Sequence, residues 1–394
     1  MINVKNKEDC CGCSACSNIC PQHCIRMEFD EEGFLYPEVD EKRCINCNLC
    51  VKVCPVLNPI SGQQEQPLCF VAYARDGTLR MNSSSGGIFG VLAQYVLSCG
   101  GTVFGAGFDS NLSVVHRGVD SIDQLHKIQG SKYVQSDILD SYIQVKKLLL
   151  NDKLVLFSGT ECQIAGLRSY LGGAEYPNLI TIDVLCHGVP SPKVMKKYFL
   201  WQEKENNSKI AEAYFRDKTW GWKNYSILLN FSNHSKYQCK ATQDCYMKLF
   251  LSNICLRPSC YTCHFKGYNR LSDLTLGDAW GVENHLPEMD DGKGTSVILV
   301  HTDKGNQLLA LVKEKICIKE ADLIQAIPPT AASIQFAVPH MNRGLFFAKL
   351  NKGADFPELV RVEKLSLVQR ILRKVKKIVI EPTSGIVHKR VSTK

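Results

Sequence analysis

Long hydrophobic runs are missing from this sequence, and their absence limits what the protein can be. No segment approaches the roughly 18 uninterrupted apolar residues that a membrane-spanning helix needs. The first ten residues, MINVKNKEDC, lack the apolar stretch of a secretory signal. We therefore expect a cytoplasmic protein. Its 394 residues, 45% hydrophobic and 22% charged, predict a small module followed by one or two larger domains.

An excess of charge of one sign is also missing from most of the chain. The formal net charge is +8, but residues 361–394 contain ten Lys or Arg and two Glu, so residues 1–360 sum to zero. This balance argues against the broad cationic face of a nucleic-acid-binding protein, and no nucleic-acid-binding motif accompanies it. We therefore expect no nucleic-acid partner.

The basic end of the chain contains an amphipathic pattern, KLSLVQRILRKVKKIVI, over residues 364–380. Its apolar residues recur at helical intervals opposite a face of Lys and Arg. Two interpretations remain open. The segment makes peripheral contact with an anionic membrane surface, or it packs on the body of the protein with its charged face in water.

Cysteine, in contrast, is abundant, with 20 residues. In a large chain, cysteines indicate metal binding or catalysis rather than a disulfide framework. Two quartets have the spacing C-x2-C-x2-C-x3-C-P, and the second is displaced from the first by 34 residues. This pattern is typical of bacterial ferredoxins that carry two 4Fe-4S clusters. The quartets consist of Cys10, Cys13, Cys16 and Cys20, and of Cys44, Cys47, Cys50 and Cys54.

In two-cluster ferredoxins, three cysteines of one quartet bind a cluster and the fourth ligand comes from the other quartet. We therefore assign cluster I to Cys10, Cys13, Cys16 and Cys54, and cluster II to Cys44, Cys47, Cys50 and Cys20. The alternative is a pair of structural zinc sites, which normally use paired C-x2-4-C spacings. Two quartets that are each followed by proline favour iron. Cys11 and Cys24 lie outside this register, and we interpret them as bystanders.

The remaining chain predicts a second, larger domain after a linker over residues 57–67, LNPISGQQEQP. Short β-rich runs such as KLVLFS and LITIDVL alternate with helical patterns, which is typical of an α/β domain. The runs IAEAYFRD and YSILLNFS predict antiparallel strands as well. The predicted architecture is a small α+β ferredoxin-like module over residues 1–60, an α/β domain with a mixed sheet over 68–345, and a basic tail over 346–394.

Four further cysteines occur in the larger domain. Cys162 and Cys186 each follow a predicted strand, so both are expected at the carboxyl edge of one parallel sheet, where such sheets bind ligands. Cys260 and Cys263 have the C-x2-C spacing of a metal-binding hairpin. Spacing alone leaves open a third metal site, with Cys255 in reserve, or inert buried thiols. We interpret the other cysteines as core or surface thiols: Cys69, Cys99, Cys239, Cys245 and Cys317.

A phosphate-binding loop is a second candidate site in this domain. In MNSSSGGIFGVLAQYV, Ser and Gly residues precede a helical pattern, and backbone N–H groups at a helix start attract anions. This loop, residues 83–87, could hold a pyrophosphate, with Lys132 as a second contact. The alternative is an ordinary serine cap and a solvated lysine.

The motifs SSSGGIFGVLAQYVL, GSKYVQSD, LFSGTECQIAGLRSYL, DVLCHGVPSPKV, RPSCYTCHFKG and SDLTLGDAWG occur in this order between about residues 68 and 311. Together they resemble the coenzyme F420 hydrogenase/dehydrogenase beta-subunit family. The resemblance implies an FAD-binding α/β domain with its own 4Fe-4S cluster. It implies cluster ligands at Cys162, Cys186, Cys260 and Cys263, and FAD contacts at Ser84, Ser85, Gly86, Gly87 and Lys132.

One motif departs from the family pattern, because Glu161 replaces the usual proline before Cys162. A carboxylate beside an electron-rich cluster should disfavour its reduction unless the carboxylate points to solvent. A role as a proton donor near the flavin is the less favoured alternative. Asp278 and Trp280 could contact cofactor or substrate, or could serve a turn and the core, and no catalytic acid or base is assigned. His187 and Asp273 are the other titratable groups in motif positions.

The predicted function is an iron-sulfur flavoprotein oxidoreductase. It would pass electrons between an external donor, such as reduced ferredoxin, and a small organic substrate through three 4Fe-4S clusters and FAD. A flavin suits this junction because it handles both hydride and single-electron transfer. Family resemblance does not transfer substrate identity, so coenzyme F420 and a carbohydrate intermediate both remain open. The alternatives are a non-catalytic electron-transfer subunit of a larger complex and a protein whose clusters are purely structural.

Overall fold

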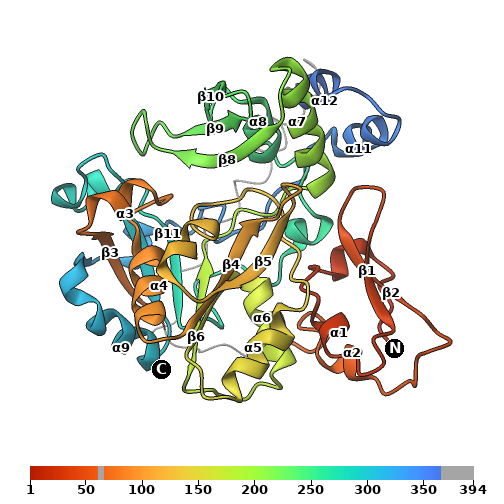
Figure 1. Ribbon diagram of the computed structural model, residues 1–394, viewed down its shortest axis with the longest axis horizontal. Helices are drawn as coiled ribbons and strands as arrows, with labels where there is room; N and C mark the ends of the chain where they lie inside the picture. Colours follow the sequence, from red (N-terminus) through yellow and green to blue (C-terminus); the bar gives the residue numbers. More distant parts are fainter. Residues whose placement is uncertain (61–65, 365–394) are drawn as a thin grey trace, which may run out of the picture.

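The computed structural model describes residues 1–60 and 66–364, and these residues form three β-sheets (Figure 1). The amino-terminal module contains the smallest sheet, an antiparallel hairpin with two short helices beside it. Its elements are η1 (Lys7–Asp9), α1 (Ala15–Asn18), β1 (Ile25–Phe29), β2 (Leu35–Val39) and α2 (Leu49–Lys52).

An eight-stranded mixed sheet is the centre of the large domain. The strand order is β13-β3-β12-β11-β7-β6-β4-β5. The neighbouring strands β4, β6, β7 and β11 are parallel, whereas the other pairs are antiparallel. The predicted combination of a small ferredoxin-like module and a larger domain with a mixed sheet is therefore confirmed. The strands are β3 (Leu68–Ala74), β4 (Thr102–Phe108), β5 (Val114–Val119), β6 (Val155–Thr160), β7 (Leu179–Val184), β11 (Leu274–Asp278), β12 (Ser296–Val300) and β13 (Ile316–Glu320).

Helices cover both faces of this sheet because its strands are apolar on both sides. Leu156 and Ile180 pack with α4 on one face, whereas the alternate residues Val155 and Phe157 pack with α5 and α6 on the other. This burial on both faces is typical of parallel strands. The helices and turns that flank the sheet are α3 (Gly77–Met81), α4 (Ile88–Ser98), η2 (Ile122–Lys127), α5 (Ser141–Leu149), α6 (Glu161–Tyr170), η4 (Val282–Asn284), η5 (Pro287–Met289), α9 (Asp303–Leu311), η6 (Lys313–Lys315) and α10 (Leu323–Ala326).

A third, antiparallel sheet lies beside the large one and has its own helices (Figure 1). It contains the two antiparallel strands that the sequence predicts. Its core is continuous with Phe34 and Tyr36 of the amino-terminal module, so the module packs against this layer. The elements are α7 (Pro192–Glu205), β8 (Ile210–Asp217), β9 (Ser226–Phe231), β10 (Lys236–Lys240), α8 (Cys245–Leu251), η3 (Pro258–Thr262), α11 (Arg343–Asn351) and α12 (Phe356–Glu363).

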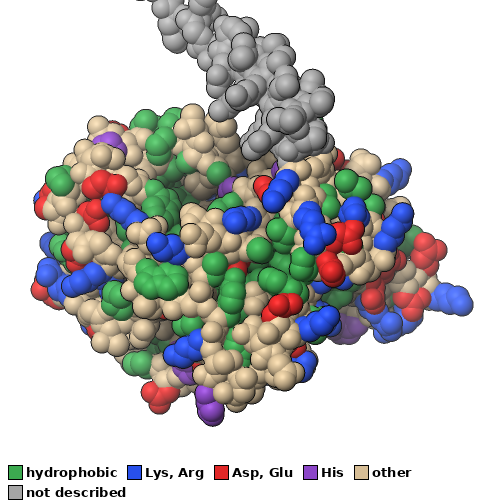
Figure 2. All heavy atoms as spheres, turned by 90° about the horizontal axis from the view of Figure 1, so that it is seen from above, with side chains coloured by type: hydrophobic (Ala, Val, Ile, Leu, Met, Phe, Trp, Pro, Cys, Tyr) green, Lys and Arg blue, Asp and Glu red, His purple; other side chains and the backbone are tan. Residues whose placement is uncertain are grey.

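The folded body extends past residue 345, where the sequence predicts the start of a tail. Helices α11 and α12 bury Phe346, Phe356 and Leu359 in the core shared with α7 and α8. Most of the predicted amphipathic segment, from residue 365 onward, lies outside the described residues, as do residues 61–65 of the predicted linker. Among the described residues, no helix is long and apolar enough to cross a membrane. On the face seen in Figure 2, basic and acidic side chains are interspersed.

Candidate functional site

The two cysteine quartets have the same local backbone. In the first loop, Gly12 and Ser14 have φ values of 70° and 59°, and in the second loop Asn46 and Asn48, each 34 residues later, have 54° and 59°. Each loop then enters a four-residue helix, α1 or α2, that carries the third cysteine of its quartet. The left-handed residues fold each loop back on itself, so the spacing seen in the sequence is a structural repeat.

The residues assigned to cluster II surround one cavity. It has a volume of about 340 Å³, including its opening to solvent. Cys47 is exposed at this opening, whereas Cys20 and Cys50 are buried. Cys24, which we interpreted as a bystander, also lines this cavity, with its Sγ 3.4 Å from that of Cys20. Five cysteines therefore line it: Cys20, Cys24, Cys44, Cys47 and Cys50.

Three of the four residues assigned to cluster I lie together. Burial raises the pKa of the Cys16 thiol, and the neighbouring sulfurs of Cys10 and Cys54 raise it further. Cys13 lies directly against Gly166 of α6, where an added methyl group would come within 2.8 Å of its Cβ. Its neighbour Cys11 packs in the same buried cluster as Cys13 and Cys162. Cys11 is thus a contact between the module and the large domain, which spacing alone did not indicate.

The four other candidate cysteines come from three segments that the fold brings together. Strands β6 and β7 are parallel neighbours, so Cys162 at the start of α6 and Cys186 just after β7 lie at the same edge. Cys260 and Cys263 arrive with η3, which is held there because the Arg257 N–H donates to the Val189 carbonyl at 3.0 Å. Burial raises the pKa of Cys263 to about 12, and the sulfurs of Cys162 and Cys186 contribute to the rise.

This set of thiols fits an iron-sulfur cluster by its chemistry. Buried thiols that raise one another's pKa stay neutral unless a cation compensates the thiolates, as cluster iron does. The Val189 N–H points at the Cys260 Sγ at 3.5 Å, a contact typical of cluster sulfurs. Within residues 1–60 and 66–364, no three His, Cys, Asp or Glu side chains converge on one metal ion. A cubane is broader than a single ion, so its thiolates need not converge so tightly. Cys255, the reserve ligand, is instead buried in the apolar core around α8.

Glu161 is buried beside this set and does not point to solvent. Its Oε1 accepts a hydrogen bond from the Leu271 N–H at 2.6 Å, and its Oε2 has no partner among the described residues. Burial raises the pKa of Glu161 well above its usual value, and nearby Asp183 adds to the rise. Burial therefore disfavours the charged form of this carboxyl group.

The predicted phosphate loop is held by cations through its carbonyl groups. Arg216 donates to the Ser84 carbonyl at 2.9 Å, and Lys218 donates to the Ser85 carbonyl at 2.5 Å. The Gly86 N–H donates to the Ser296 hydroxyl at 3.0 Å. Within the described part of the chain, the N–H groups of the remaining loop residues Ser84, Ser85 and Gly87 donate no hydrogen bond. These groups are available for an anion at the start of α4.

Close packing explains both glycines of this loop. A Cβ on Gly86 would lie 2.4 Å from the Ala72 carbonyl oxygen, and Gly87 has a φ of 86°. The glycines therefore let the loop approach β3 closely and turn into α4. The loop's Ser84 hydroxyl accepts hydrogen bonds from the N–H and the hydroxyl of Ser131, the residue that precedes Lys132. This contact brings the segment that contains Lys132 next to the loop.

Lys132 has the features of a cation that lacks its anion. Its Nζ donates to the Gln129 carbonyl at 2.7 Å, and no Asp or Glu in the described residues lies within ion-pair distance. Burial lowers the pKa of Lys132 to about 7. A partly buried ammonium without a counter-charge is unfavourable, and a phosphate would supply one.

The other motif residues are held in structural contacts. Asp278 forms a bidentate ion pair with Arg216, both bonds at 2.8 Å, and accepts from the Trp222 indole at 3.0 Å. Trp280 stacks on Trp222 with ring centroids 4.6 Å apart. Asp273 is buried and accepts from the Thr181 N–H and hydroxyl. His187 shares a 2.6 Å hydrogen bond with Asn253. Arg216 is the residue here that sequence reasoning missed.

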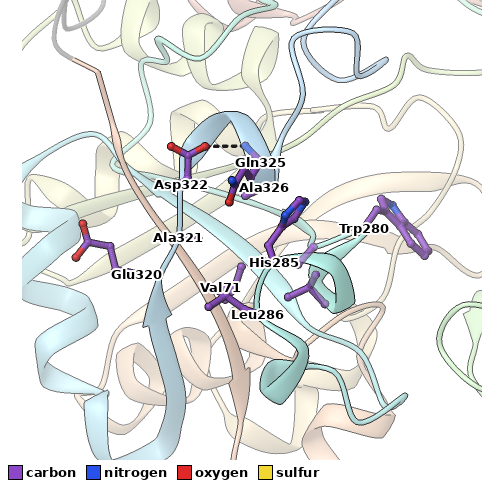
Figure 3. A pocket seen from close by; sticks show the side chains of 11 residues that line it. Val71, Trp280, His285, Leu286, Glu320, Ala321, Asp322, Gln325 and Ala326 are labelled. Atoms are coloured by element: carbon purple, nitrogen blue, oxygen red, sulfur yellow. Dashed lines mark hydrogen bonds between the residues drawn. The ribbon is translucent and has the colours of Figure 1, made fainter.

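An open pocket of about 430 Å³, including its mouth, lies next to Trp280 (Figure 3). It is bounded by Val71 of β3, by His285 and by Asp322, which caps α10. Figure 3 shows His285 and the capping pair Asp322 and Gln325 around it, with Trp280 at one side. Trp280, a candidate contact for cofactor or substrate, lines this pocket, whereas none of the predicted cluster or phosphate residues does.

Comparison with known proteins gives two family matches. Residues 152–326 match the family described as the C terminus of the coenzyme F420 hydrogenase/dehydrogenase beta subunit. Residues 9–58 match the 4Fe-4S dicluster domain. The first match includes all four cysteines of the third set, and the second includes both quartets.

Curated relatives align only with the amino-terminal module. NADH-quinone oxidoreductase subunit I 2 of Geobacter metallireducens is 41% identical over 56 residues, which are 13% of this chain and 43% of that protein. An uncharacterized ferredoxin of Methanocaldococcus jannaschii is 35% identical over 52 residues, 13% of this chain and 66% of that protein. The chain thus spans less than half the length of the two NADH-quinone oxidoreductase proteins that it matches.

A solved structure is similar over a longer stretch. A chain of the F420-reducing [NiFe] hydrogenase complex from Methanosarcina barkeri is 16% identical, with 82% of this chain and 97% of that chain covered and a TM-score of 0.46. A TM-score below 0.5 does not establish a shared fold, so the assignment depends on the family matches. Residues 9–58 match the 4Fe-4S dicluster domain, and residues 152–326 match the C-terminal domain of the coenzyme F420 hydrogenase/dehydrogenase beta subunit.

Proposed function

We propose that this chain is an iron-sulfur flavoprotein that transfers electrons between a redox partner protein and an organic substrate. Its cofactors are the two clusters of the dicluster domain, a third 4Fe-4S cluster held by the four cysteines of the large domain, and FAD. The observation that carries the proposal is the proximity of Cys162, Cys186 and the Cys260/Cys263 pair to one another, beside the Cys11 contact with the module.

Exposure suggests the order in which electrons move. Cys47 of the second quartet is exposed, so a partner protein can approach cluster II. Cys13 of the first quartet is buried against α6, and Cys11 packs in one cluster with both Cys13 and Cys162. Cluster I therefore lies between the surface and the third set, which makes it the intermediate carrier.

The contacts of the phosphate loop support FAD at the other end of this path. Three N–H groups of the loop and the Lys132 ammonium can bind a pyrophosphate, and the glycines let it approach the backbone. Arg216 and Lys218 hold the loop's carbonyls, so they fix the direction of these N–H groups. A bound flavin would supply the exchange between two-electron and one-electron chemistry.

Anaerobic purification followed by iron, sulfide and flavin analysis tests the proposal. Three cubanes predict about twelve irons per chain, together with one FAD. Eight irons and no flavin would reduce the chain to its dicluster domain. Substrate turnover by the isolated, chemically reduced chain would distinguish an enzyme from a subunit that only relays electrons.

A cysteine variant locates the third cluster. Cys260→Ser should lower the iron content by about four per chain and leave the spectra of the first two clusters unchanged. Cys239→Ser is the matched control, because Cys239 on β10 lies in the antiparallel sheet and outside the thiol set. An unchanged iron content in Cys260→Ser, or an equal loss in both variants, would contradict the third site.

A further inference from the structure

Arg257 is a fully buried cation at the junction of the module and the large domain. Its exposed fraction is 0%. The guanidinium donates to the Cys10 carbonyl at 2.8 Å, to the Leu35 carbonyl at 2.9 Å and to the Gln135 side-chain oxygen at 2.9 Å. These three acceptors are neutral, although a guanidinium stays charged at any physiological pH.

Arg257 differs in this respect from the other buried arginines that the structure describes. All four of the others pair with an Asp or Glu within 4 Å, whereas no carboxylate of the described residues lies at that distance from Arg257. The four pairs are Arg80 with Asp291, Arg168 with Glu175, Arg216 with Asp278, and Arg270 with Asp183. A buried charge without a counter-charge is strongly unfavourable, so Arg257 requires another source of negative charge.

The Cys10 sulfur is the candidate that contacts it. The Nη2 atom lies 3.6 Å from the Cys10 Sγ. The Phe34 and Tyr36 rings also face the guanidinium and exclude water from it. Thiolates bound to iron would therefore supply the negative charge that Arg257 requires.

The backbone of the first quartet is shaped around Arg257. A Cβ on Gly12 would lie 2.7 Å from Nη1, so only glycine lets the loop close over the guanidinium. The cations near cluster II differ from Arg257 because they are exposed to solvent. The Met1 amino group and Arg43 are exposed, with acceptors Asn48 and Gln22. Water and salt screen exposed charges, but they screen a buried one much less.

Reduction adds one negative charge to a cluster that its thiolates already make negative. A buried positive charge close to a ligand sulfur stabilises that added charge and raises the reduction potential. We propose that Arg257 is the internal counter-cation of cluster I, and that it gives cluster I a higher reduction potential than cluster II. Single electrons that enter at the exposed cluster II then move downhill to cluster I and toward the large domain. This inference rests on the cluster ligands of the proposed function.

The test is a redox titration of the anaerobic full-length holoprotein, monitored by electron paramagnetic resonance. The signal that changes in Cys47→Ser identifies cluster II. In Arg257→Gln, the ratio of reduced to oxidised cluster I at a fixed potential should fall about tenfold, which equals about 59 mV for one electron. Arg257→Lys keeps the charge and should retain most of the wild-type ratio. The cluster II ratio should not change in either variant.

Arg343→Gln is the matched control for loosened docking. Arg343 also joins the module to the large domain, through a bidentate pair with Glu32, but no cysteine sulfur accepts a bond from it. An unshifted cluster I in iron-replete Arg257→Gln would overturn the proposal, as would equal shifts in both variants. If Arg257→Gln does not assemble cluster I, the reduction potentials of the wild-type protein provide the test. A wild-type cluster I potential equal to or below that of cluster II would also contradict the proposal. The iron count tests the third cluster independently.

Discussion

The first and second cysteine quartets share a backbone but have opposite surroundings. Cys13 of the first is buried against Gly166 of α6, and a buried arginine faces Cys10. Cys47, the counterpart of Cys13 in the second quartet, is exposed, and the arginine next to that quartet, Arg43, lies at the surface. Local sequence therefore determines how each loop folds, whereas tertiary contacts determine how each cluster behaves. This difference can turn two equivalent loops into an inner and an outer carrier.

The largest expected effect comes from the contact that makes the first quartet an inner one. Gly166→Ala places a methyl group 2.8 Å from the Cys13 Cβ and 2.9 Å from the Tyr142 hydroxyl. Overpacking of this kind costs about 1–3 kcal/mol, so we expect that loss in the free energy of unfolding. Iron at cluster I should be lost as well, because the module can no longer seat on α6. Denaturant unfolding and iron analysis measure both effects.

Gly344→Ala is the control for this substitution. Gly344 lies near the start of α11, and a Cβ there would meet no atom within 4 Å. Replacing a helical glycine by alanine in open space is neutral or stabilising by up to about 1 kcal/mol. Similar stabilities and iron contents for both variants would show that the first quartet does not depend on its contact with α6.

The same contrast between buried and exposed cations predicts an effect at the phosphate loop. Lys132 has a pKa of about 7, lowered by burial, so it is largely protonated below pH 7 and neutral above it. A bound phosphate favours the protonated form, so binding takes up a proton above pH 7. The affinity for FAD should therefore fall as pH rises above 7, by at most about tenfold per pH unit. Titration of FAD onto flavin-depleted protein, followed by fluorescence, measures this slope.

Lys132→Met should weaken FAD binding by about 1.5–3 kcal/mol and remove the pH dependence. Lys127→Met removes an exposed cation five residues away and should leave both properties unchanged. If Lys132→Met retained the wild-type affinity and slope, the Ser-Gly-Gly loop would have to bind its ligand without this ammonium, and the phosphate assignment would fail.

Sequence patterns indicated the parts of this molecule that depend on local spacing. The quartet spacing predicts loops that recur with the same φ values at Ser14 and Asn48. Strand patterns placed Cys162 and Cys186 after neighbouring parallel strands, because strand ends can be read from apolar runs. The Ser-Gly-Gly loop precedes a helix for the same reason.

Long-range contacts could not be predicted in this way. Arg257 lies 247 residues from Cys10 in the chain, and nothing in RPSCYTC indicates that its guanidinium faces the first quartet. Glu161 is held in its buried position by a hydrogen bond from the Leu271 N–H. Cys24 lies beside Cys20 because of the way the hairpin folds over cluster II. Such features arise from packing between distant segments, which a single sequence does not specify by spacing.

The smallest expected effect is at the outer quartet, and it tests whether exposure is what separates the two clusters. Arg43 is exposed and donates to the Gln22 carbonyl at 2.9 Å. Because exposed charges interact by only about 0.2–1 kcal/mol, Arg43→Gln should change the reduced-to-oxidised ratio of cluster II by less than about fivefold. In 1 M salt, where the Debye length is about 3 Å, even this change should vanish, whereas the effect of Arg257→Gln on cluster I should persist. A salt-independent shift in Arg43→Gln would mean that the second quartet is as enclosed as the first, and the distinction between inner and outer carrier would be lost.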